Sequence, residues 1–158
     1  MDDVALARAA HVLAVVLWIG GVALVTTVLL PAVRSVVPPA QRVSFFEAVE
    51  RRFAWQARFT TLLAGLSGFH MLARLDLWER LADPLRGWWM YAMIGVWGVF
   101  SLMLFVAEPL FLHAWFLRQA RLAPEATFAR IQRLHWALLT VSLVTVLGAV
   151  AGSHGWGG

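Results

Sequence analysis

The chain has 158 residues, 61% of them hydrophobic, and a mean hydropathy of +0.73. Soluble domains are about 45–50% apolar, so this composition excludes an ordinary soluble protein and indicates a membrane protein. The formal net charge is +4, and all thirteen basic residues are arginines. They gather between apolar runs, as in membrane loops, which argues against nucleic-acid binding. The absence of cysteine excludes disulfides, iron–sulfur clusters and covalently attached c-type haem.

Four apolar runs predict four membrane-spanning helices in a single domain, 1–158. The first span covers roughly 4–30 and ends at Pro31; it is too long for a signal-peptide core, so we interpret it as a retained helix. A short interfacial amphipathic helix is expected over Gln41–Glu50. The second span follows at 53–75 and carries a stripe of small residues that would permit close helix contact: Ala57, Thr61, Ala64, Gly65 and Gly68.

The third span, 88–117, contains Glu108-Pro109, which predicts a kink with a helical extension beyond it. An arginine-containing loop, 118–133, is expected before the fourth span at 134–153. The predicted fold class is therefore all-α, an integral membrane antiparallel four-helix bundle.

The distribution of arginines predicts the orientation in the membrane. Nine of them lie in or beside the connections between spans one and two and between spans three and four: Arg34, Arg42, Arg51, Arg52, Arg58, Arg118, Arg121, Arg130 and Arg133. Four lie on the other side: Arg8, Arg74, Arg80 and Arg86. Because cytoplasmic loops are enriched in basic residues, we expect both termini in the periplasm of a bacterial inner-membrane protein.

Each of the four runs carries one histidine, an expensive residue at membrane depth and therefore a candidate for function. Alternating helix directions place His11 and His70 at one depth on the side of the termini. The same argument places His113 and His135 together on the opposite side. Two imidazoles that face each other from neighbouring helices can ligate the iron of a b-type haem. The sequence thus predicts two pairs of metal ligands.

Two arginines and a tryptophan share helix faces with the first pair. Arg8 precedes His11 by three residues and Arg74 follows His70 by four, so each arginine is placed to neutralise a haem propionate. Trp18 lies seven residues after His11, two turns along the same face, and is a further candidate for contact with the cofactor.

Other interpretations of these side chains stay open. Imidazole also suits copper, so a copper site at the same four histidines competes with haem. His135 also fits an amphipathic anchor at the interface, and His154 in the glycine-rich tail fits a solvated residue. Glu108 fits either a catalytic proton relay for a bound quinol or a structural ion pair with an arginine such as Arg58.

Segments along nearly the whole chain resemble the CopD-like family of small bacterial membrane proteins. They are the run from His11 to Gly21, Pro31-Ala32, Arg51-Arg52-Phe53, residues 62–68, residues 108–113, His135-Trp136 and residues 148–154. The resemblance implies an inner-membrane protein whose histidines can hold haem or copper. That family resembles, more distantly, the HemJ-type protoporphyrinogen oxidases, four-helix proteins associated with b-type haem. The HemJ pattern relies on an intramembrane lysine that this chain lacks, which argues against protoporphyrinogen oxidation.

The expected function is that of a membrane oxidoreductase, a b-type cytochrome with one or two haems. It would move electrons between the quinol pool and a redox partner at the periplasmic face, alone or as an oligomer. Two alternatives remain: a protein that binds and transports copper, and a non-redox structural subunit of a respiratory complex.

Overall fold

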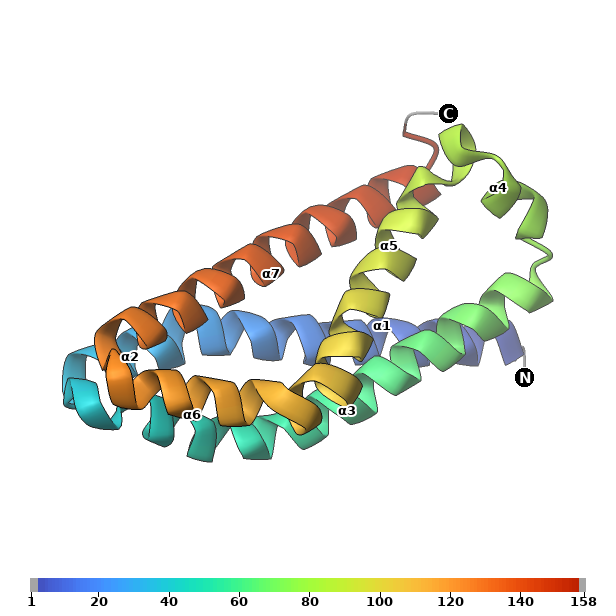
Figure 1. The fold of residues 1–158 in the computed structure, drawn as a ribbon. Helices are drawn as coiled ribbons and strands as arrows, with labels where there is room; N and C mark the ends of the chain where they lie inside the picture. The colour runs from blue at the N-terminus through green and yellow to red at the C-terminus, as the bar shows by residue number, and fades with distance from the viewer. Residues whose placement is uncertain (1–2, 157–158) are drawn as a thin grey trace.

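The computed structural model describes residues 3–156, except for the side chains of residues 84–86, among them Arg86 of the orientation argument. The described chain is all-helical, with 93% helix and no strands (Figure 1). The elements in chain order are α1 Asp3–Leu24, the π-helical turn η1 Val25–Leu29, α2 Leu30–Val36, the 3-10 turn η2 Pro39–Gln41 and α3 Arg42–Arg74. There follow α4 Trp78–Ala82, α5 Pro84–Leu102, the π-helical segment η3 Met103–Leu112, α6 His113–Leu122 and α7 Pro124–Ser153.

The first helical rod runs through Pro31 and ends at Val36, beyond the predicted end of the first span. The π turn η1 explains this difference. Leu30 N–H bonds to Val25 O, five residues back, which widens the helix just before the proline ring. Pro31 then occupies the start of α2, a position where a missing N–H is tolerated.

The interfacial helix predicted over Gln41–Glu50 is not a separate element, because α3 runs unbroken from Arg42 to Arg74. No proline follows Pro38-Pro39 in this part of the sequence, so nothing ends the helix at the expected boundary. The helix ends where Asp76 adopts φ 49°, a left-handed conformation that aspartate tolerates better than most residues.

The kink predicted at Glu108-Pro109 is present, and the helix continues beyond it as α6. Pro109 lies within η3, and Figure 1 shows the chain changing direction between α5 and α6. The loop predicted over 118–133 is wrong, however. α6 extends to Leu122, Ala123 alone connects it to α7, and α7 begins at Pro124, ten residues before the predicted span. The arginines there lie on helices rather than in a loop.

Helix α1 packs along α3, and α5 packs along α7. The predicted small-residue stripe of α3 is buried at Ala57, Thr61, Ala64 and Gly65. Ala64 lies beside His11 of α1, whereas Thr61 and Gly65 contact Trp97 of α5. Figure 1 shows α7 diverging from α1 and α3 toward the end of the molecule that holds both termini. One core cluster lies mid-way along the helices around Trp18, and a second lies at the α2 end around Phe46.

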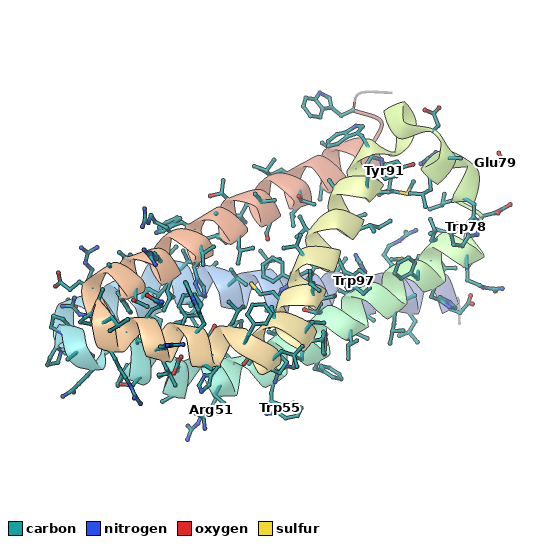
Figure 2. All side chains as sticks on the ribbon, viewed as in Figure 1. Arg51, Trp55, Trp78, Glu79, Tyr91 and Trp97 are labelled. Carbon is teal, nitrogen blue, oxygen red and sulfur yellow. The ribbon has the colours of Figure 1, made fainter. Side chains whose placement is uncertain are left out.

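Within the described residues, three helical rods are long and apolar enough to cross a membrane: Asp3–Val36, Gly87–Leu122 and Pro124–Ser153. At most a third of each apolar window is buried within the protein, so most of its large side chains face outward. Such apolar surface is unfavourable in water and indicates a membrane protein. Figure 2 shows Trp55 projecting outward from α3 close to Arg51, a combination typical of a membrane interface.

Candidate functional site

Two of the cavities between the described helices are lined by histidines singled out from the sequence. We call the larger one, about 750 Å³, the terminus-side cavity; it is walled by α1, α3, α5 and α7 and lined by His11, Trp18, Ser142 and His154 among others. The smaller one, about 160 Å³, is the loop-side cavity; it is lined by Phe46, Glu50, Glu108, His113 and His135 among others. Ligand pockets in proteins are about 300–1,000 Å³, so only the first has room for a large cofactor.

His11 enters the terminus-side cavity from α1, half-buried and held by α3. Its Nδ1 lies 2.9 Å from Ala64 O and 3.2 Å from Ser67 Oγ. The carbonyl can only accept, so Nδ1 carries the proton and Nε2 keeps its lone pair. A Cβ placed on Gly68 would lie 3.3 Å from His11 Cε1, so a glycine at this position leaves room for the ring. Metal-ligating histidines are oriented in this way by a second partner.

His70 and Arg74 do not line this cavity. Both contact Asp3 at the start of α1, with His70 Nε2 at 3.5 Å and Arg74 Nε at 2.7 Å from Asp3 Oδ2. The His70 side chain is 46% exposed. The structure therefore does not bring His11 and His70 together around one cavity, and it gives Arg74 a carboxylate partner of its own.

His154, expected to be a solvated tail residue, instead lines the cavity together with His11. Its Nδ1 lies 2.8 Å from Val150 O and 3.3 Å from Ser153 Oγ, which again leaves Nε2 with its lone pair. Alternating helix directions would have indicated this placement, because the end of the fourth span and the start of the first lie on the same side of the bilayer.

Two arginines also line the terminus-side cavity: Arg8, as the sequence suggested, and Arg80 from α4. Both lie on the side of the termini, where anionic groups of a ligand would leave the apolar part of the cavity. Arg80 was not singled out from the sequence because it is distant from every histidine along the chain.

Two unsatisfied polar atoms belong to residues that line this cavity. Within residues 3–156, Trp18 Nε1 and Ser142 Oγ are buried without a hydrogen-bond partner. Trp18 is 4% exposed and packs edge-on against Phe100, at 4.9 Å between ring centroids. Buried polar groups nearly always have a partner, so these two atoms are exceptions to the usual rule.

The loop-side cavity gathers carboxylates and imidazoles from α3, η3, α6 and α7. His135 Nδ1 lies 2.9 Å from Ile131 O, and its Nε2 lies 4.0 Å from Glu50 Oε1. His113 Nδ1 lies 3.5 Å from Glu47 Oε1. The predicted neighbours His113 and His135 thus line one cavity, but each faces a glutamate of α3.

Glu108 lines the same cavity and forms the ion pair with Arg58 that was one of its two expected roles. Arg58 Nε also donates to Leu104 O at 3.1 Å. In the π-helical register the donor for Leu104 O would be the N–H of residue 109, which is a proline and has none. Arg58 therefore supplies the donor that Pro109 cannot.

Glu47 and Glu50 were missed as site residues because the sequence placed them on a separate interfacial helix. Glu50 precedes the predicted span at 53–75, and it faces an imidazole rather than an arginine. Burial raises the pKa of Glu50 to about 7, and the neighbouring carboxylates of Glu108 and Glu47 add to this rise. This carboxyl therefore exchanges its proton near neutral pH.

No three His, Asp or Glu side chains in the described part of the chain form a ready-made metal-ligand set. Comparison with protein-family models, curated proteins and solved structures finds no match to this chain. What the two cavities do must therefore be argued from their own chemistry.

Proposed function

We propose that the protein is a bacterial inner-membrane cytochrome that holds one b-type haem in the terminus-side cavity. In this proposal the 53–75 part of α3 crosses the membrane as the second span, beside Asp3–Val36, Gly87–Leu122 and Pro124–Ser153. The four spans form an antiparallel bundle, and both termini are periplasmic. The observation that carries the proposal is a cavity of about 750 Å³ into which His11 presents an Nε2 with a free lone pair, its Nδ1 fixed by Ala64 O. The CopD-like resemblance agrees with it.

The residues around the cavity fit a haem. His11 would hold the haem iron through Nε2. His154 is the second imidazole that lines the cavity, in the place predicted from the sequence for His70. Arg8 and Arg80 would bind the propionates, and the apolar walls would exclude water from the porphyrin face. When bound, the haem supplies a one-electron couple, which suits transfer between the quinol pool and a periplasmic redox partner. We propose one haem rather than two because the loop-side cavity is only about 160 Å³.

Copper is the second candidate because soft donors line the same cavity. Met71 of α3 and Met90 and Met93 of α5 lie on its walls with His11. Thioether sulfur and imidazole together suit copper(I). The volume favours haem, since a single ion would leave most of the cavity unfilled.

The experiment is to purify the full-length protein in detergent and to measure its reduced-minus-oxidised spectrum, its haem-to-protein ratio and its copper content. We expect one haem per chain. His11→Ala should abolish haem binding, and His154→Ala should leave haem bound with a changed spin state. His70→Ala is the matched control and should match the wild type.

The other outcomes distinguish between haem at His11 and His154, haem at His11 and His70, and copper. Loss of haem in His70→Ala with retention in His154→Ala would restore the originally predicted pair. Full haem content in His11→Ala would refute the assignment of this cavity. Stoichiometric copper without haem would establish the copper alternative.

A further inference from the structure

The loop-side cavity holds an imidazole and a carboxylate that face each other without touching. His135 Nε2 and Glu50 Oε1 are 4.0 Å apart, too far for a direct hydrogen bond. Because His135 Nδ1 donates to Ile131 O, Nε2 is an acceptor. A hydroxyl oxygen needs about 2.8 Å to each partner, so a single hydroxyl can donate to His135 Nε2 and accept a hydrogen bond from the protonated Glu50 carboxyl.

The other ionisable groups around the cavity have partners of their own. Glu108 pairs with Arg58, and Glu47 lies 3.5 Å from His113. Arg51 also lines the cavity and interacts electrostatically with Glu47. Of the described ionisable groups that line the cavity, Glu50 and His135 are thus left facing each other. The Glu50 carboxyl can accept a hydrogen bond when it is ionised or donate one when it is protonated.

The walls around this pair suit a flat ring. Phe46 packs edge-on to His135, with 5.5 Å between ring centroids, and Phe100 and Leu138 are apolar neighbours. Leu134 of α7 also lines the cavity and is 52% exposed, so the cavity reaches the outer surface of the helices. A lipid-soluble molecule could enter by this route from the bilayer.

We propose that the loop-side cavity binds the hydroxylated ring of a quinol, with one hydroxyl bridging His135 Nε2 and the Glu50 carboxyl. The inference deepens the proposed function and rests on it for the quinol as electron source. A phenolic ring fits better than water alone, because the site combines one polar edge with aromatic and aliphatic walls.

The test measures the binding of decylubiquinol to the full-length protein in detergent, anaerobically, by titration calorimetry. The comparison ligand is its dimethyl ether, in which both hydroxyls are blocked. Wild type should bind the quinol about tenfold or more tightly than the ether, since the ether has no hydroxyl that can donate to the buried acceptor His135 Nε2. Glu50→Leu and His135→Leu should each remove this preference.

The controls are Glu79→Leu, an exposed glutamate of α4, and His70→Ala, and both should keep the wild-type preference. Glu50→Gln is the fallback if the leucine variants do not fold, and it should reduce the preference. Equal binding of quinol and ether by wild type, or an undiminished preference in the foldable Glu50 and His135 variants, would overturn the inference.

Haem content is measured on the same samples, which separates the two proposals. A quinol preference that depends on Glu50 in a protein without haem would leave the site standing and refute the cytochrome. Bound haem without a quinol preference would support the cytochrome and refute the quinol site.

Discussion

Arg58 carries two interactions at the bend between α5 and α6, and its removal should destabilise the protein in a calculable way. Arg58→Ala leaves Leu104 O without its donor, at a cost of about 1–3 kcal/mol. It also leaves Glu108 without its cation. Breaking a fully buried pair costs about 3–5 kcal/mol, but the two side chains are 22% and 37% exposed, so we take about 1 kcal/mol after allowing for screening. The expected loss is about 2–4 kcal/mol.

A double-mutant cycle tests the reasoning. Pro109→Ala returns an N–H to the position from which a π-helical bond reaches Leu104 O, so Arg58→Ala should cost about 1 kcal/mol less in that background. The assay is unfolding in detergent followed by circular dichroism, with Arg130→Ala, an exposed arginine, as the control. An equal cost of Arg58→Ala in both backgrounds would refute the claim that Arg58 replaces the proline donor.

Four further predictions concern two glycines, Glu50 and the orientation in the membrane. Gly65→Ala places a Cβ 2.7 Å from the Trp97 ring, whose N–H donates to Thr61 O at 2.9 Å, so unfolding should show a loss of about 1–3 kcal/mol. Gly98→Ala meets nothing within 4 Å and should be neutral or gain up to about 1 kcal/mol; a loss as large as that of Gly65→Ala would contradict the packing. Because the folded pKa of Glu50 is raised from 4.5 to about 7, its contribution to stability is fully present below pH 4.5 and is lost as pH rises through about 7. The shift corresponds to about 3 kcal/mol, which we reduce to about 1 kcal/mol because the side chain is 39% exposed; the wild-type unfolding midpoint should fall over this range and that of Glu50→Gln should not. Finally, an alkaline phosphatase fused to the C-terminus should be active in cells, and activity of a cytoplasmic reporter there would reverse the proposed orientation.

The existence of the long helices could be predicted from the sequence, but several of their ends could not. Apolar run length identifies α1, α5 and α7 because each belongs to a rod long and apolar enough to cover about 30 Å of hydrocarbon. The predicted loop at 118–133 failed because polar composition suggested a loop, whereas Pro124 begins a new helix there. Hydropathy indicates which residues can lie in lipid, but it does not indicate where a helix ends, because a helix can continue outside a bilayer.

The positions of His11 and His70 show that equal depth along two helices does not determine whether their side chains meet. His11 and His70 were matched by depth, but the rotation of α3 decides which side chains face α1. His70 lies six residues after Ala64, about 240° around the helix, so it points away from the face that holds His11. Asp3, close by in the fold, then offers it a partner. The rotation of α3 could have been inferred from its small-residue stripe. That Asp3 is the partner of His70 could be seen only in the structure.

Trp18 links the chemistry of the two cavities, because it lines both. It is buried against Phe100 at the middle of the core, so one aromatic side chain stands between the cavity of His11 and that of Glu50 and His135. The indole has no ionisable group, so it offers protons no relay from one cavity to the other. Electrons need only a short separation between donor and acceptor. In the proposed cytochrome, this arrangement would keep the protons of a quinol on the loop side while its electrons pass toward the termini.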